Sequence, residues 1–219
     1  MVDKKMTKQQ AEIEELLHKA RMHEGARKLD DLEYRRKKQE LAFMESHDAN
    51  NRFYFFDDTI TDLNTEVWGR ELRTDQRRNG KGKVVVNIDS GGGSIYAGFS
   101  LMDEVAALQA KGVKYEMRVR GMAASMAGVI LQQADERLCG PNSYIMIHRA
   151  SAFLMGNSAN LEDDVNRLRE LEARIQKIFI ERSGGKLKKS VVEGWWKAKS
   201  DIWIDAPEAL KLGLIDRIG

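Results

Sequence analysis

A run of β-branched residues, KVVVNI at positions 83–88, leads directly into three glycines and then into a helical run. Few folds contain a β-branched strand, a glycine turn and a helix in that order. A short apolar run rich in valine and isoleucine is typical of a strand buried on both faces, as in parallel sheets. A glycine turn that carries the chain from such a strand into a helix begins a βα unit. We therefore expect a parallel sheet with helices packed against it.

The rest of the chain continues the alternation of strands and helices. We expect strands at 52–56, at 114–121 and on either side of the Gly140-Pro141 turn, and helices at 96–110, about 160–182 and about 191–199. VWGREL at 67–72 predicts part of a helix, and the polar stretch 73–83 predicts a loop. The apolar segment around Ser125 is long enough for a helix, and residues 201–219 predict a strand, a short helix and a strand. An α/β fold with a mainly parallel sheet follows.

Composition excludes several classes of protein. The 219 residues include 36 Lys and Arg against 34 Asp and Glu, so the net charge of +2 gives no strong attraction to nucleic acid or to a membrane surface. No run of 18 apolar residues is present, and the charged N-terminus lacks the apolar segment of a cleavable signal. The single cysteine, Cys139, rules out an intramolecular disulfide. We expect a cytoplasmic protein with no nucleic-acid or membrane partner.

The chain is expected to divide near residue 50. Residues 1–50 carry equal numbers of basic and acidic side chains. Their clearest apolar pattern is a narrow helical stripe made by Ile13, Leu16, Leu17 and Ala20. This segment has too few large apolar residues for a core of its own, so we interpret it as a charged helical arm, either solvated or in contact with another subunit or a partner. Residues 51–219 would form the folded domain.

Ser125 is the only hydroxyl residue of GMAASMAG, positions 121–128. A serine hydroxyl is a poor nucleophile until an adjacent base takes its proton. Three of the four histidines lie within the first 50 residues, and the fourth, His148, ends an apolar strand. Each residue also has an ordinary explanation, the serine as a helix N-cap and the histidine as a structural residue at a strand end. Together they predict a serine nucleophile with a histidine base.

The glycine cluster in DSGGGSIYAG supplies a possible site for negative charge. A glycine-rich turn between a strand and a helix points backbone N–H groups at an anion. The glycine spacing differs from the GxGxxG of dinucleotide-binding folds, and the Gly-Lys-Ser/Thr ending of a phosphate loop is absent. An oxyanion hole shared between this turn and the backbone N–H that follows Ser125 fits the sequence better.

Four motifs resemble the Clp protease proteolytic subunit family, ClpP, in order along residues 52–218: DSGGGSIYAG, GMAASMAG, PNSYIMIHRA and DAPEALKLGLID. The resemblance implies a ClpP/crotonase-like α/β fold of repeated β-β-α units and a serine endopeptidase activity. It further implies that Ser125 is the nucleophile, His148 the general base and Asp201 the third member of a catalytic triad. Asp205 is the nearest rival to Asp201.

The resemblance also assigns the oxyanion hole, to the backbone N–H groups of Gly93 and Met126. The sequence departs from the family pattern at two places in the site. Gly91 replaces the usual proline of the glycine motif, and Arg149-Ala150 replaces the usual Gln-Pro after the histidine. The second change is expected to reshape the substrate cleft.

Family resemblance implies protein or peptide substrates, no metal or organic cofactor, and a homo-oligomeric ring. Such rings are commonly heptameric and often stacked in pairs, with the long helix from about residue 160 lying between the two rings. The charged arm stands where the family has short N-terminal loops that meet an ATPase, so coupling to an unfoldase is left open. Variants of this kind resemble bacteriophage ClpP-like proteases that trim capsid or scaffold proteins, in a bacterial or phage-infected cell.

Two other functions are compatible with the same fold. One is a non-catalytic ring or scaffold subunit in which the triad residues are present but misaligned. The other is a crotonase-type acyl-CoA enzyme, which would use carboxylates and would need neither Ser125 nor His148.

Overall fold

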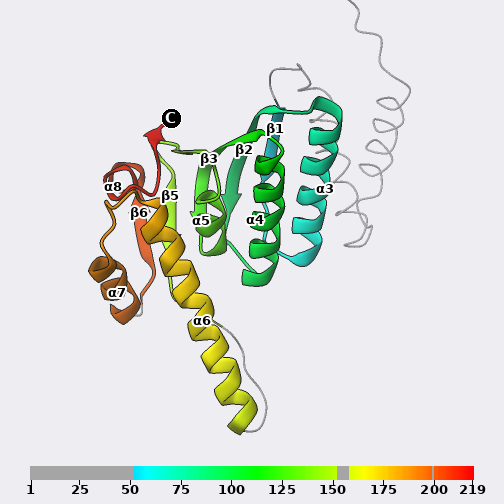
Figure 1. Cartoon of the computed structure of the whole chain (residues 1–219). Coiled ribbons are helices and arrows are strands. Elements are labelled where there is room, and N and C mark those ends of the chain that lie inside the picture. The colour runs from blue at the N-terminus through cyan, green and yellow to red at the C-terminus, as the bar shows by residue number, and fades with distance from the viewer. Residues whose placement is uncertain (1–51, 152–157, 199) are drawn as a thin grey trace, which may run out of the picture. The chain divides into compact units, whose positions relative to one another are not determined.

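Strands and helices alternate along the described part of the chain, residues 52–151, 158–198 and 200–219 of the computed structural model (Figure 1). The elements are β1 Arg52–Phe56, α3 Asp62–Asn79, β2 Gly82–Ser90, α4 Ile95–Ala110, β3 Val113–Ala124, α5 Met126–Leu131, β4 Glu136–Cys139, β5 Tyr144–Ile147, α6 Ser158–Arg182, α7 Lys189–Ala198, β6 Ile202–Asp205, α8 Ala206–Leu212 and β7 Arg217–Ile218. The expected arm at 1–50 lies outside the described residues, so the division of the chain near residue 50 stays a prediction.

All seven described strands belong to one sheet, with β1, β2, β3, β4 and β7 in that order. The long strand β3 pairs in parallel with β2 along one edge. Along its other edge, its first half pairs with β4 and its last residues pair with β5, both in parallel. β6 is antiparallel to β5 and continues the sheet beyond it. The predicted α/β fold with a mainly parallel sheet is confirmed.

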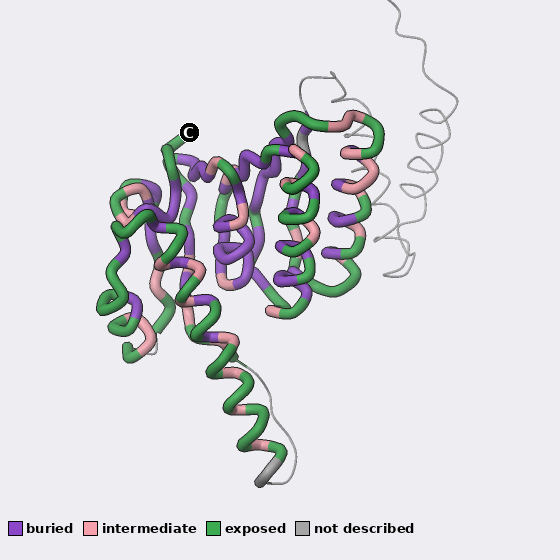
Figure 2. The backbone as a smooth tube through the Cα atoms, viewed as in Figure 1, coloured by how far each residue is buried: buried purple, intermediate pink, exposed green. Residues whose placement is uncertain are grey.

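The core lies between this sheet and helices α3, α4 and α5, which cover one face of it (Figures 1 and 2). Alternate residues of β3 point into the core and are at most 1 % exposed. These are Val113, Tyr115, Met117 and Val119. Burying one large apolar side chain contributes about 1.5–3 kcal/mol, so this face dominates the stability of the sheet. The intervening residues of β3 are polar or charged and point to the opposite face.

One of those intervening residues, Glu116, is nevertheless buried, at 1 % exposure. Its carboxylate forms ion pairs with Lys83 on β2 and with Arg118, two residues along β3, and lies 3.4 Å from the Arg217 guanidinium of β7. Burial opposes its ionisation, but hydrogen bonds from Lys83 and Arg118 outweigh burial and hold the pKa of Glu116 at about 2. The ion pairs of the Glu116 carboxylate therefore connect β2, β3 and β7.

Helix α3 corrects one expectation. The stretch 73–83 was expected to be a loop, but α3 continues to Asn79. Leu72 and Asp75 are both buried in this helix, and polar residues occupy its outer face. The helix ends only at Gly80, whose φ of 66° is easy for glycine. The polar composition of residues 73–79 conceals their helical state, because most of these side chains lie on the outer face of α3.

The segment around Ser125 is the second correction. β3 runs on to Ala124, so a strand leads directly to Ser125. The helix begins only after it, and α5 has six residues. Ala123 and Ala124 are buried and pair with β5, and their small side chains suit that close pairing. The expected strand 114–121 is thereby lengthened and the expected helix shortened.

The 25-residue helix α6 has two different halves. Its second half buries Ile175 and Phe179 against the body of the domain. Its first half extends beyond that body and is exposed over most of its surface (Figures 1 and 2). An apolar stripe of partly exposed residues runs along this half, formed by Leu161, Val165 and Leu168.

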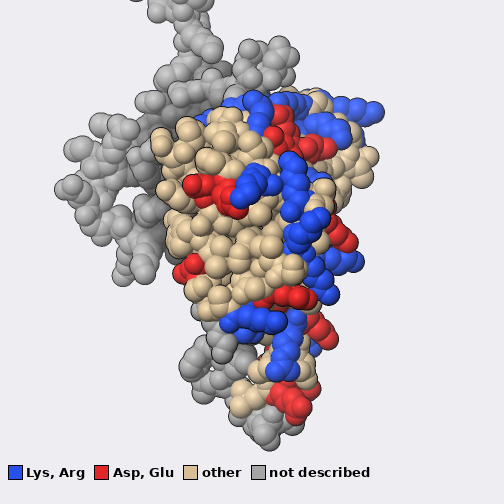
Figure 3. All heavy atoms as spheres, turned by 90° about the vertical axis from the view of Figure 1, so that its left-hand side faces the viewer, with Lys and Arg blue, Asp and Glu red and all other residues tan. Residues whose placement is uncertain are grey.

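The face turned toward the viewer in Figure 3 carries most of its basic and acidic side chains along one margin, and a broad area of mostly uncharged residues lies beside it. Among the described residues, no helix is both long enough and apolar enough to cross a lipid bilayer.

Candidate active site

Ser125 stands at the junction of β3 and α5 in an unusual backbone conformation. Among the described residues it is the one non-glycine residue with a positive φ, 54°. Its N–H donates to the Met146 carbonyl of β5 at 2.8 Å, and its carbonyl accepts from the Gly128 N–H at 3.1 Å. A positive φ costs a non-glycine residue about 1–3 kcal/mol, and such strain persists only where surrounding contacts hold it. Its side chain makes no capping bond to α5, so the hydroxyl is free for another contact.

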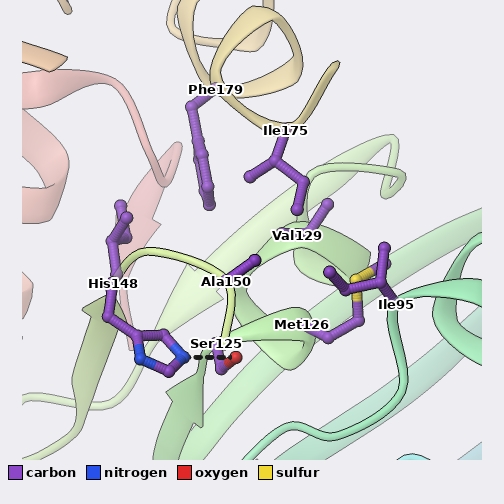
Figure 4. Close-up of a pocket in the computed structure, with 9 residues that line it drawn as sticks. Ile95, Ser125, Met126, Val129, His148, Ala150, Ile175 and Phe179 are labelled. Carbon is purple, nitrogen blue, oxygen red and sulfur yellow. Dashed lines mark hydrogen bonds between the residues drawn. The ribbon is translucent and has the colours of Figure 1, made fainter. Parts of the chain in front are cut away.

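That contact is with His148, the residue that follows β5. Nε2 of His148 lies 2.7 Å from the Ser125 hydroxyl oxygen (Figure 4). The register of the sheet brings the two together, because Ala124, which precedes the serine, pairs with Met146 in the parallel ladder of β3 and β5. The predicted serine and histidine, 23 positions apart in the sequence, are therefore hydrogen-bonded in the fold.

The other ring nitrogen of His148 faces Asp201. Ile147 pairs with Ile202 in the antiparallel ladder of β5 and β6, so the residues just beyond that pair lie opposite one another. The distance from His148 Nδ1 to Asp201 Oδ1 is 3.7 Å, longer than a hydrogen bond. The Asp201 side chain is 57 % exposed. The structure thus brings Asp201 beside the imidazole but leaves the contact loose.

Asp205, the rival carboxylate, lies at the far end of the same ladder, opposite Tyr144. Its Oδ1 accepts a hydrogen bond of 2.9 Å from the Glu208 N–H. Asp205 is the N-cap of α8, a common position for aspartate because the carboxylate satisfies a free N–H of the first turn. The geometry therefore gives the two aspartates different surroundings, and only Asp201 faces His148.

The glycine turn packs directly against the serine. A Cβ atom added to Gly92 would lie 2.6 Å from the Ala124 carbonyl oxygen, so no larger residue fits there without a shift of the backbone. The turn is fixed on its other side by Ile60, whose N–H donates to the Gly92 carbonyl at 2.9 Å. The Ile60 carbonyl accepts from the Ser94 N–H at 2.8 Å. Ser94 then caps α4, which begins at the next residue.

The two backbone N–H groups predicted to form the oxyanion hole belong to Gly93, in the glycine turn, and to Met126, directly after Ser125. Among the described residues, no hydrogen bond runs from the Gly93 N–H or from the Met126 N–H. Met126 is the first residue of α5, where the leading N–H groups of a helix lack partners within it. Free N–H groups beside a nucleophile can hold an oxygen that becomes negative during the reaction.

An apolar pocket opens beside Ser125 and His148 (Figure 4). Its other lining residues come from α4, α5, β5, the segment after β5, and α6: Ile95, Met126, Val129, Ile147, Ala150, Ile175 and Phe179. The two from α6, Ile175 and Phe179, point from the helix toward the pocket in Figure 4. The sequence did not predict that Ile175 and Phe179 line a pocket beside Ser125. Their apolar spacing along α6 indicates only that this face of the helix is buried.

Other chemistries find no support in the described residues. No three His, Cys, Asp or Glu side chains of the described part gather into a possible metal site. The Cys139 thiol is buried, and burial together with the charge of Asp205 raises its pKa to about 11. Cys139 is therefore a protonated thiol at neutral pH and a poor rival to Ser125 as a nucleophile.

Comparison with known proteins identifies the family. The family model described as Clp protease matches residues 36–219. The ATP-dependent Clp protease proteolytic subunit of Porphyromonas gingivalis is 31% identical over 171 residues, which cover 77% of this chain and 73% of that protein. Proteolytic subunit 1 of Chlamydia trachomatis serovar D is 29% identical over 174 residues, or 77% of this chain and 86% of its own length. The chain belongs to the Clp protease family and is a serine endopeptidase of the ClpP type.

Proposed function

We propose that the chain hydrolyses peptide bonds in proteins through a triad of Ser125, His148 and Asp201. The observation that carries this proposal is the 2.7 Å contact between His148 Nε2 and the Ser125 hydroxyl, at the start of α5 and beside the glycine turn. A hydroxyl in contact with an imidazole can lose its proton as it attacks a carbonyl carbon.

The proposed reaction has two halves. In the first, Ser125 Oγ attacks the peptide carbonyl while His148 Nε2 takes the hydroxyl proton, and His148 then gives that proton to the leaving amine. In the second, water attacks the resulting ester with His148 again as the base, which frees the acid product and restores the serine. The N–H groups of Gly93 and Met126 would hold the negative oxygen of each tetrahedral intermediate.

Asp201 would stabilise the imidazolium that forms in both halves. Its 3.7 Å separation from His148 Nδ1 is compatible with this role, because hydrogen bonds between catalytic groups often tighten only when substrate is bound. The capping bond of Asp205 supports Asp201 as the acid of the triad.

The pocket supports a preference for an apolar side chain next to the scissile bond. Apart from Ser125 and His148, every residue that lines it is apolar. A charged substrate side chain would lose its hydration there without gaining a partner. We propose that this pocket selects the substrate residue whose carbonyl is attacked.

We further propose that the protein works as a homo-oligomeric ring, in which the first half of α6 contacts another copy. The partly exposed stripe of Leu161, Val165 and Leu168 supports this, since a protruding helix with an apolar stripe is most stable when that stripe is covered. A heptameric ring, stacking in pairs, an ATPase partner, a cytoplasmic location and a role in phage capsid maturation rest on the family resemblance and stay predictions.

Neither alternative function has an observation in its favour. A scaffold subunit with misaligned catalytic groups would not need the hydrogen bond between Ser125 and His148. An acyl-CoA enzyme of the crotonase type would need neither residue.

The test is labelling with a fluorophosphonate, followed by intact-mass analysis and peptide mapping. We expect one adduct at Ser125 in the wild type, none in Ser125→Ala, and labelling slowed by about 10²–10⁴-fold in His148→Ala, because general-base catalysis contributes about that much. A folded, assembled wild type that gives no adduct at Ser125 would contradict the proposed function.

A further inference from the structure

Helix α6 holds a buried carboxylate that contacts the segment directly after His148. Glu172 is 5 % exposed, although it belongs to a helix whose other charged residues are mostly at the surface. It accepts three hydrogen bonds: 3.1 Å from Arg149 Nε, 3.2 Å from Arg149 Nη2 and 3.1 Å from the Ala150 backbone N–H. Arg149 and Ala150 are the two residues that follow His148.

These contacts differ in kind from an ordinary surface ion pair. A carboxylate taken out of water must be compensated by charge and hydrogen bonds, and a two-pronged arginine contact with an added backbone N–H does so with a fixed geometry. Glu172 in turn raises the pKa of Arg149, through their hydrogen bond and their opposite charges. The Lys177–Glu181 pair on the same helix is 3.7 Å long with both side chains more than 60 % exposed. Pairs of that kind contribute little.

The imidazole of His148 needs such an anchor. Its contact with Asp201 is 3.7 Å long, and Asp201 is mostly exposed, so the aspartate alone holds the ring loosely. On the N-terminal side, the β5 strand fixes the backbone up to Ile147. On the C-terminal side, Glu172 fixes Arg149 and Ala150. The histidine backbone is therefore held from both directions.

The same helix also forms the pocket. Ile175 and Phe179 follow Glu172 by three and seven positions, so all three lie on one face of α6. Ala150, whose N–H donates to Glu172, lines the same pocket. A shift of α6 would thus reach the His148 segment and the pocket wall together.

We infer that Glu172 is a positioning residue, which sets the place of His148 by holding Arg149 and Ala150 against α6. The inference rests on the proposed function of His148 as the general base. It also gives a role to the pair Arg149-Ala150, one of the places where the sequence departs from its family pattern. Loss of the clamp would let the imidazole move away from the Ser125 hydroxyl, and a misplacement of about 1 Å can cost about 10²-fold in rate.

The experiment measures the rate constant for fluorophosphonate labelling of Ser125, with the labelled fraction and the melting temperature measured on each protein. Glu172→Ala is expected to slow labelling about 10–100-fold. The labelling rate constant of Glu172→Gln should lie between those of Glu172→Ala and the wild type, because the amide oxygen can still accept the Ala150 N–H. Arg149→Met removes the charge partner of Glu172 and should also slow labelling, with a lower melting temperature because the buried carboxylate loses its compensating charge. Glu181→Ala is the matched control on α6 and should label at the wild-type rate.

Two outcomes would overturn the inference. One is an unchanged labelling rate constant in Glu172→Ala; if the labelled fraction and the melting temperature alone fall, the role of Glu172 is purely structural. The other is a wild type that is not labelled at Ser125, which would refute the proposed function itself and so is distinguishable from the first.

Discussion

Ser125 directly precedes α5, where a serine hydroxyl usually accepts an N–H of the first helical turn, yet its hydroxyl contacts His148 instead. Its φ of 54° is an unfavourable backbone conformation for a residue other than glycine, and it accompanies this contact. Asp205 shows the opposite case, because its carboxylate makes the usual capping bond. At the scale of residues, the side chains proposed for catalysis are those not engaged in the ordinary roles of their positions.

The two aspartates can be separated by their variants. Asp201→Asn is expected to lower kcat for peptide cleavage about 10–100-fold, less than the roughly 10⁴-fold known for a buried triad aspartate, because Asp201 is exposed and its contact is loose. Asp205→Ala should keep kcat per labelled site while costing about 1 kcal/mol of stability through the lost cap. Steady-state kinetics and thermal unfolding measure the two effects. The reverse pattern, with kcat lost only in the Asp205 variant, would reassign the triad.

At the scale of elements, α6 combines two surfaces in one helix. Its second half supplies Glu172, Ile175 and Phe179 behind and beside the candidate active site. Its first half presents the apolar stripe proposed to contact another copy. The two proposed roles of α6 therefore lie on separate halves of the helix and can be tested separately.

The stripe can be tested without touching the site. Val165→Asp and Leu168→Asp are each expected to lower the mass of the assembly measured by light scattering, because a buried charge in the contact has no partner. Asn166→Asp, an exposed neighbour, adds the same charge away from the stripe and should leave the mass unchanged. An assembly whose mass is the same in all three variants would argue against this contact.

At the scale of the whole molecule, the sheet is stabilised by different interactions on its two faces. The helix-covered face is apolar, and the other face ties β2, β3 and β7 together through the buried Glu116 and its basic partners. A carboxylate with a lowered pKa in the folded state adds stability only while it is ionised. For Glu116 that contribution is complete at a pH above the ordinary glutamate pKa of 4.5. It disappears as the pH falls toward the folded-state pKa of about 2.

Glu116→Gln is therefore expected to be destabilised most near neutral pH. As the pH is lowered from about 5 toward 3, the wild type should lose unfolding free energy and approach the variant, because its unfolded state takes up the proton more readily. Urea unfolding of both proteins across this range measures the difference, with the exposed Glu181→Gln as the control. A difference that stays constant across the range would show that the charge of Glu116 does not stabilise the fold.

Local patterns in the sequence were sufficient for the type of fold and for two residues of the site. The β-branched strand, the glycine turn and the helix after it depend on periodicity and turn chemistry, which neighbouring residues determine. Ser125 and His148 could be paired because His148 is the only histidine after residue 50 and Ser125 is the only hydroxyl residue within the small-residue segment 121–128. Asp201, Gly93 and Met126 came from family resemblance, and their roles stay predictions; the structure puts Asp201 3.7 Å from His148 and Met126 directly after Ser125.

The tertiary structure decided what depends on segments far apart in the chain. The antiparallel register of β5 and β6 puts His148 opposite Asp201 rather than Asp205, and no local pattern contains that register. The helical state of 73–79 required the burial of Leu72 and Asp75, which their polar neighbours conceal. The clamp from Glu172 to Arg149 and Ala150 spans more than 20 positions. Sequence by itself determines local conformation, whereas contacts between distant segments follow from how the elements pack.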